Sequence, residues 1–186
     1  MNGNDTPPER LEPVLAQIQQ NDERALASLD GLAEDYPEDA RLPFLKGSLL
    51  AGLQRYTEAR GAMQQAVRIA PGYALARFQL GLLELSSGDP AAAQSTWLPL
   101  RDLPTDSYLG LFVQGLEKMI GDDFPAAIAL LEGGIARNTD LPPMNRDMAL
   151  MITAMREKLD GVSAGPDVDS GAHFLLRQYS FKDTKH

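Results

Sequence analysis

The sequence predicts an all-α fold in which helical hairpins stack along the chain, and three observations support this prediction. Residues of the same kind recur at a fixed spacing of 34 positions, which accommodates two helices and a turn. Within each half of this period, apolar residues recur every three or four positions, as they do on one face of an α-helix. Hydrophobic residues make up 44% of the 186 residues, so the chain can bury a core of ordinary size.

The period appears in four aligned series of residues. They are Phe44, Phe78 and Phe112; Gly47, Gly81 and Gly115; Ala25, Ala59, Ala93 and Ala127; and Leu29, Met63, Trp97 and Leu131. A glycine or alanine in the middle of a helix lets another helix approach closely, and the bulky residue fills the space beside it. A single hairpin cannot bury its apolar face alone, so we expect successive hairpins to stack.

The first half of the chain contains two predicted repeats, residues 9–39 and 40–73, after a polar start. Residues 1–8 contain paired prolines and are expected to be disordered. The first repeat is irregular, because Pro13 stands where the other first helices carry glycine. Pro71 cannot continue a helix and so ends the second helix of the second repeat. The predicted helices of this half span residues 9–20, 22–35, 40–53 and 56–69.

The third and fourth repeats are predicted at residues 74–107 and 108–141. Gly88 supplies backbone freedom in the turn of the third repeat, and Pro90 starts the next helix. Pro99 would interrupt that helix, so we expect a kink or an early end near Trp97. The fourth repeat has predicted helices at 107–120 and 124–137, the second of them capped by Asp122 or Asp123.

A capping helix is predicted within residues 142–160, followed by a flexible linker and an apolar tail within residues 161–186. One interpretation is that the helix covers the fourth repeat; the other is that its methionine-rich face is an adaptable binding surface. Its apolar face consists of Met144, Met148, Met151, Ile152, Met155 and Leu159. The tail contains a predicted docking segment formed by Phe174, Leu175, Leu176, Tyr179 and Phe181.

Within one period, four residues carry a family signature. Gly81 in the first helix, Gly88 in the turn, Ala93 in the second helix and Trp97 after it resemble the tetratricopeptide repeat family. The resemblance covers about residues 10–160. It implies a right-handed α-α superhelix, or solenoid, whose concave groove is lined by the first helix of each hairpin. It also implies a groove that binds an extended peptide or an amphipathic helix of a partner protein.

Carried onto this sequence, the resemblance gives a set of groove-lining residues. The partner-binding candidates are Arg41, Phe44 and Ser48; Leu75, Phe78, Leu82 and Leu85; and Leu109, Phe112, Leu116 and Met119. Only Arg41 is of the type with which some family members clamp a terminal carboxylate, so that activity is not transferred. The three phenylalanines predict apolar anchors entering the groove, and the alternative is that their rings pack between adjacent first helices.

The charge balance narrows the choice of partner. The chain has 17 basic and 26 acidic residues, a net charge of −9, which argues against nucleic acid and against anionic membrane surfaces. No apolar stretch is long enough to insert into a membrane, and no signal peptide is recognisable, so we expect a cytoplasmic protein. A mature exported form whose signal has been removed is the alternative.

Residues for catalysis are sparse. The chain has no cysteine, and both histidines, His173 and His186, lie in the tail. The carboxylate pair Asp122 and Asp123 is explained by helix capping. We therefore predict no metal site, no cofactor and no enzymatic activity.

Three functions remain open at this stage. The first is a protein–protein interaction scaffold or adaptor that binds through an apolar groove. The second is a secretion chaperone, since the bacterial chaperones that hold translocator proteins are similarly small, acidic and built of about three such repeats. The third is a regulatory subunit of an enzyme complex. The tail can fold back into the groove of its own chain or self-associate with that of a neighbouring chain, and the sequence does not decide between these.

Overall fold

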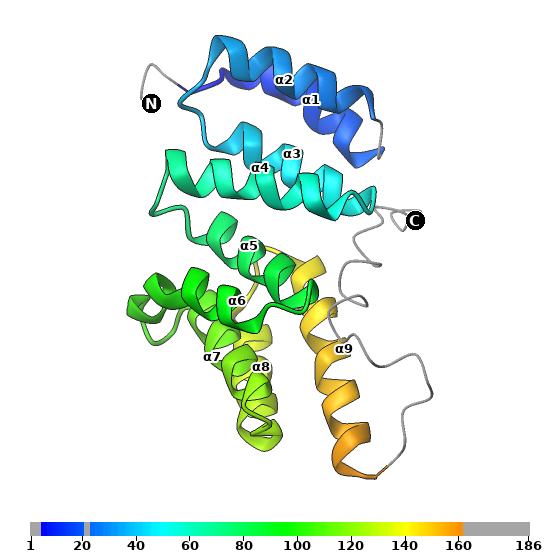
Figure 1. Ribbon diagram of the computed structural model, residues 1–186, viewed down its shortest axis with the longest axis vertical. Coiled ribbons are helices and arrows are strands. Elements are labelled where there is room, and N and C mark those ends of the chain that lie inside the picture. The colour runs from blue at the N-terminus through cyan, green and yellow to red at the C-terminus, as the bar shows by residue number, and fades with distance from the viewer. Residues whose placement is uncertain (1–4, 21–22, 162–186) are drawn as a thin grey trace. The chain divides into compact units, whose positions relative to one another are not determined.

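The computed structural model describes residues 5–20 and 23–161, and within these residues it is built of helices (Figure 1). The all-α fold class predicted from the repeat is therefore confirmed. The helices are α1 (Pro8–Gln19), α2 (Arg24–Asp35), α3 (Arg41–Gly52), α4 (Tyr56–Ile69), α5 (Ala74–Ser86), α6 (Pro90–Trp97), the 3₁₀-helix η1 (Leu98–Asp102), α7 (Tyr108–Ile120), α8 (Phe124–Arg137) and α9 (Pro142–Leu159).

The described residues form two compact units. Unit 1 ends at Leu83 and unit 2 begins at Glu84, so the boundary lies inside α5 and inside the predicted third repeat. The predicted linker beyond Gly161 and the tail docking segment lie outside the described residues.

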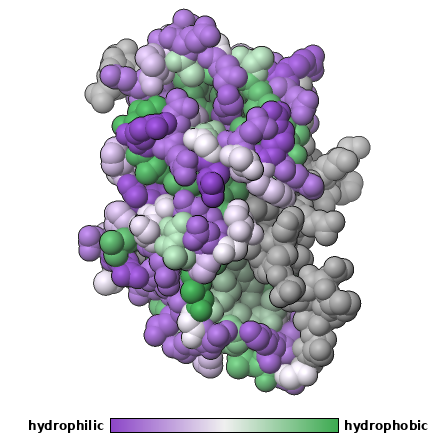
Figure 2. All heavy atoms as spheres, viewed as in Figure 1, coloured by the Kyte–Doolittle hydropathy of each residue, from purple (hydrophilic) through white to green (hydrophobic). Residues whose placement is uncertain are grey.

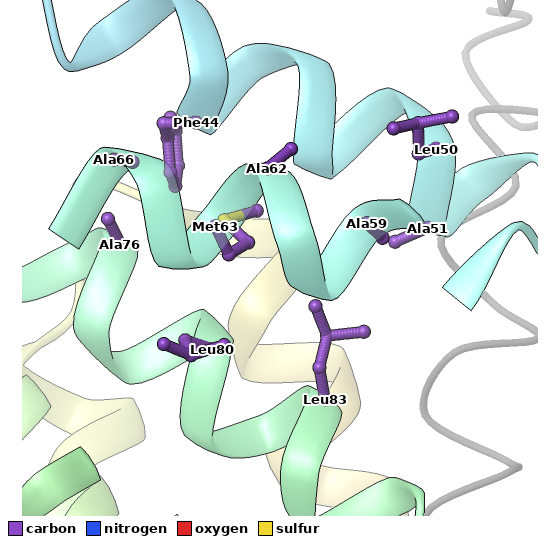
Figure 3. Close-up of a cluster of buried hydrophobic side chains, with 10 residues drawn as sticks. All are labelled: Phe44, Leu50, Ala51, Ala59, Ala62, Met63, Ala66, Ala76, Leu80 and Leu83. Carbon is purple, nitrogen blue, oxygen red and sulfur yellow. The ribbon is translucent and has the colours of Figure 1, made fainter. Parts of the chain in front are cut away.

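In unit 1, α3 is buried on two of its faces. Leu42 and Leu49 pack with the apolar faces of α1 and α2, whereas Phe44 and Leu50 pack with α4 and α5. Figure 3 shows this second cluster, in which Phe44 of α3 lies beside Ala66 of α4 and Ala76 of α5. A helix with two buried faces leaves only a narrow strip of its surface for a partner.

The small residues of α3 and α4 meet as the repeat predicts. A Cβ built on Gly47 would lie 2.9 Å from Cγ of Met63 and 3.1 Å from the carbonyl oxygen of Ala59. Both partners come from α4, so the glycine, the alanine and the bulky residue of one period form a single contact. The absence of a side chain at Gly47 is what allows α3 and α4 to pack this closely.

Unit 2 repeats this contact in α7 and α8. A Cβ on Gly115 would lie 2.7 Å from Cδ2 of Leu131 and 3.2 Å from the carbonyl oxygen of Ala127. The predicted early end near Trp97 is confirmed as well, because α6 stops at this residue and η1 continues the chain. Pro99 explains this end, since a proline cannot donate the hydrogen bond that the next α-helical turn needs.

The turns of unit 2 also follow the sequence. Gly88 has φ +79°, the left-handed conformation that glycine adopts easily. Asp89 and Asp123 each accept a hydrogen bond from the backbone N–H three residues on, and so cap α6 and α8. Of the two capping candidates named for α8, Asp123 is the cap, and Asp122 has φ +58° in the turn before it.

The capping helix α9 packs against α8 through its methionine face. Met144, Met148, Met151, Ile152 and Met155 are buried, whereas Leu159 is exposed. At its start, Asn145 donates a hydrogen bond to the carbonyl oxygen of Asn138 at 3.0 Å, and Nδ2 of Asn138 donates to Oδ1 of Asn145 at 2.8 Å. The face that the sequence offered as a binding surface is thus mostly covered within the chain.

Candidate partner-binding site

Three predicted groove residues, Arg41, Phe44 and Ser48, lie along α3 at a spacing of three or four. The hydroxyl of Ser48 donates to Oε1 of Gln79 on α5 at 3.2 Å and to the carbonyl oxygen of Phe44 at 3.0 Å. Leu75, also predicted, is half-buried at the start of α5 and packs against the cluster that contains Phe44. In unit 1 the sequence therefore selected residues that meet between α3 and α5.

An aromatic pair lies beside these residues. The rings of Phe44 and Tyr73 have centroids 5.1 Å apart and planes inclined at 46°. Phe44 is 9% exposed, and Tyr73 is half-buried just before α5 begins. Burial raises the pKa of the Tyr73 hydroxyl above its usual value, so this phenol stays neutral at physiological pH. A tilted ring pair with one ring partly accessible can contact an apolar or proline side chain.

At the start of α3, Asp39 and Arg41 form an ion pair with two hydrogen bonds. Nε of Arg41 donates to Oδ1 of Asp39 at 2.8 Å, and Nη2 donates to Oδ2 at 2.7 Å. The same pair holds Thr6, whose N–H donates to Oδ2 of Asp39 at 2.9 Å and whose carbonyl oxygen accepts from Nη2 of Arg41 at 3.0 Å. One ion pair thus satisfies both main-chain groups of a residue more than 30 positions away.

Burial alone would raise the pKa of Asp39, which is only 2% exposed. The hydrogen bonds from Arg41 and Thr6 outweigh this effect and lower its pKa to about 2. Of the start over residues 1–8 that was expected to be disordered, the structure describes residues 5–8. Among these, Thr6 is 2% exposed and held by the ion pair, and Pro8 already belongs to α1.

Most of the remaining predicted residues are buried. Phe78 and Phe112 are fully buried, and the buried leucines of this set are Leu82, Leu109 and Leu116. Leu85 and Met119 are half-buried. Phe112 packs inside its own hairpin, since a Cβ on Gly134 of α8 would lie 2.4 Å from Cε1 of its ring. Phe112 therefore packs against α8, the second helix of its own hairpin, and this contact is neither an exposed anchor nor the packing between adjacent first helices that was the alternative interpretation.

We call the residues that gather in unit 1 the α3–α5 face. It consists of Asp39, Arg41, Phe44, Ser48, Tyr73, Leu75 and Gln79. Sequence reasoning missed Asp39, Tyr73 and Gln79, although the position of Asp39 just before a helix was a signal for hydrogen bonding to backbone N–H groups. Figure 2 shows the surface around α1–α4 as mainly polar, with apolar side chains in small separate patches.

No three His, Cys, Asp or Glu side chains in the described part of the chain lie close enough together to hold a metal ion. None of the described helices is both long enough and apolar enough to cross a membrane.

Comparison with known proteins identifies one region. Residues 19–74 match the model of a family described as Tetratricopeptide repeat. This region runs from the end of α1 to the start of α5 and therefore contains Asp39, Arg41, Phe44, Ser48 and Tyr73. No curated protein matches the chain.

Proposed function

Because this chain is a tetratricopeptide repeat protein, we propose that it is a non-catalytic adaptor that holds a peptide segment of a partner protein against the α3–α5 face. Tetratricopeptide repeats generally mediate protein–protein interaction. The proposal adds a location within unit 1 and a mode of binding, in which main-chain hydrogen bonds give affinity and neighbouring side chains select the sequence.

One observation carries the proposal: this face already binds a peptide segment. Asp39 and Arg41 hold the N–H and the carbonyl oxygen of Thr6, and neither contact involves the threonine side chain as donor or acceptor. The aromatic pair Phe44 and Tyr73 lies near the same ion pair, since the charges of Asp39 and Arg41 both act on the Tyr73 hydroxyl. A backbone clamp beside an apolar contact is the minimum that recognition of an extended peptide needs.

The test compares two substitutions of the same kind. Gln79→Arg places a long cation on the α3–α5 face, whereas Gln65→Arg places one on the exposed side of α4. We expect partner proteins captured by the tagged wild-type chain to be retained by the Gln65→Arg chain and lost by the Gln79→Arg chain. Thermal unfolding of both variants serves as the folding control.

A partner set that is the same for both variants, with both folded, would show that partners bind elsewhere. If no protein is captured specifically by the wild-type chain, the adaptor proposal itself fails. Quantitative mass spectrometry with untagged protein as competitor separates specific partners from background in either case.

A further inference from the structure

We propose that Asp5–Pro7 is a tethered, displaceable occupant of the peptide site, and that an extended segment of another chain enters by replacing it. This inference rests on the proposed function and deepens it, because it states what the site recognises and what regulates access to it. The incoming segment offers the main-chain N–H and carbonyl oxygen that Thr6 offers now.

Asp39 and Arg41 contact Thr6 through its main-chain groups. The carboxylate of Asp39 accepts from the Thr6 N–H, and the guanidinium of Arg41 donates to the Thr6 carbonyl oxygen, at 2.9 and 3.0 Å. Both groups are present in every residue except proline, whose nitrogen has no hydrogen. The site therefore binds extended backbone of many sequences, and its ligand has a residue other than proline at the clamped position.

The site is costly to leave empty. Asp39 is 2% exposed, and its Oδ2 accepts hydrogen bonds from both Thr6 and Arg41. A buried carboxylate that loses a donor is destabilised, so the site favours some peptide over none. Exchange of one segment for another avoids this cost, because the carboxylate is never left without its donor.

The side chain of Thr6 fits the site imperfectly. The hydroxyl of Thr6 is buried, and no group in the described part of the chain forms a hydrogen bond of ordinary geometry with its Oγ1. It lies close enough to Asp39 to help lower the pKa of that carboxyl, but its geometry towards the described residues falls short of an ordinary hydrogen bond. A segment with a better fitting side chain would bind more tightly than Thr6 does.

Asp5 and Pro7 indicate which residues are favourable on either side of the clamped residue. The carboxylate of Asp5 acts electrostatically on Arg41, so an acidic residue just before the clamped position is favourable. Pro7 follows in an extended conformation, with φ −61° and ψ 145°. The ligand class is thus an extended peptide that carries an acidic residue before the clamped residue and an extended residue after it.

The tether explains why a weak occupant still holds the site. A segment attached to its site acts at an effective concentration of about millimolar or more, and a free peptide must compete with it. Weakening the tethered contact should therefore raise the apparent affinity for a peptide in trans. Thr6→Pro weakens the tethered contact in the full chain. Proline keeps an extended backbone but lacks the N–H that donates a hydrogen bond to Asp39.

The probe is a fluorescent, N-acetylated peptide with the sequence of residues 2–9 of this chain. We expect the Thr6→Pro chain to bind it at least about 10-fold more tightly than the wild-type chain does, in fluorescence anisotropy. Thr105→Pro, the same change in an exposed loop of unit 2, should behave as wild type. Adding Asp39→Asn or Arg41→Ala to Thr6→Pro should abolish binding. A peptide N-methylated at the threonine should not bind the Thr6→Pro chain.

A second measurement uses the wild-type chain and so does not depend on a variant that folds. Millimolar peptide should accelerate hydrogen exchange of the Thr6 amide, while exchange of the Leu50 amide in the core stays unchanged. If Thr6 exchange is unaffected by peptide, or if a folded Thr6→Pro chain gains no affinity, the segment is a fixed part of the fold and the proposal is overturned. That result would not change the outcome expected for partner capture with Gln79→Arg. Conversely, failure of partner capture would not change the outcome expected for peptide exchange, so the two proposals are tested independently.

Discussion

Hairpin α3–α4 in unit 1 and hairpin α7–α8 in unit 2 bring equivalent residues together but differ in how closely they pack. A Cβ on Gly47 would meet the unbranched, flexible side chain of Met63 at 2.9 Å. A Cβ on Gly115 would meet the branched side chain of Leu131 at 2.7 Å. The position within the 34-residue repeat therefore determines which residues meet. The shape of the bulky residue determines how large a side chain the glycine position tolerates.

The two units also differ in how they accommodate a buried carboxyl group. Asp39 in unit 1 receives hydrogen bonds from Arg41 and Thr6, which lower its pKa to about 2. Asp147 on α9 in unit 2 is 5% exposed, and no group within residues 5–20 and 23–161 donates a hydrogen bond to it in the structure. Burial raises its pKa to about 7, and the neighbouring charge of Arg146 only partly offsets this. Neither carboxyl belongs to the 34-residue pattern.

The largest expected effect comes from making the hairpins alike at one position. Gly134 faces Phe112 in unit 2, and Ala66 holds the equivalent position beside Phe44 in unit 1. Gly134→Ala would place a Cβ 2.4 Å from the Phe112 ring and 3.3 Å from the Tyr108 carbonyl oxygen. We expect a loss of about 3 kcal/mol in the free energy of unfolding, measured by urea denaturation.

The reciprocal substitution is the control for this position. Ala66→Gly removes a buried methyl group and lowers helix propensity but creates no clash, so we expect a loss of about 1–2 kcal/mol. Equal losses for the two variants would mean that the Phe112 ring moves aside as easily as a cavity forms, and the packing difference between the hairpins would disappear.

The next effect tests the paired carboxyl group. Asp39→Asn keeps the shape but removes the charge that Arg41 and Thr6 bind, and we expect a loss of about 2 kcal/mol at pH 7, discounted because the Arg41 side chain is 42% exposed. The folded pKa lies below the ordinary value of 3.8, so the stabilisation is present above about pH 4 and is lost as the pH falls towards 2. Denaturation at pH 7 and pH 2 should show the difference in stability between the variant and the wild type nearly disappearing at the lower pH.

The buried carboxyl group of Asp147 should respond in the opposite direction. The pKa of Asp147 in the folded protein is raised from 3.8 to about 7. The free energy of unfolding is therefore highest below about pH 4 and falls as the pH rises through 7. Asp147→Asn should therefore match the wild type near pH 4 and be more stable by about 2 kcal/mol at pH 8. Fluorescence of Trp97, the single tryptophan, reports unfolding of unit 2.

Asp106→Asn provides the matched control, because Asp106 is exposed in the same unit and loses the same charge. If both aspartate variants show the same pH dependence, the effect comes from net charge and not from burial. A stabilisation that appears only in the Asp147 variant would confirm that burial of this carboxyl group on α9 destabilises its charged form.

These differences mark the limit of what the sequence predicts. The spacing of Gly47, Ala59 and Met63 predicted both the hairpin and the contact inside it, and Pro99 predicted the end of α6, because both depend on local geometry. The exposure of Phe112 could not be predicted, because phase fixes the face of a helix but not what covers it. The contact of Asp39 with Thr6 joins residues 33 positions apart outside the repeat, and Asp147 falls among methionines on a helical face that otherwise looked uniformly apolar.

The smallest expected effect comes from adding a methyl group at Gly47 or at Gly115. Gly→Ala in a helix gains up to about 1 kcal/mol of helix propensity, which offsets part of any clash. Gly47→Ala meets Met63, whose terminal atoms can rotate away, so we expect a net loss of about 1 kcal/mol. Gly115→Ala meets the branch point of Leu131, which cannot move without shifting α8, and we expect a net loss of about 2 kcal/mol.

Exchanging the neighbours then decides whether side-chain shape is the cause. Adding Leu131→Met to Gly115→Ala should recover most of the difference of about 1 kcal/mol, because methionine has nearly the same volume without the branch. Adding Met63→Leu to Gly47→Ala should increase the loss by a similar amount. If neither exchange alters the cost of the added methyl group, the backbone oxygens of Ala59 and Ala127, at 3.1 and 3.2 Å, limit the approach, and both hairpins are equally closed.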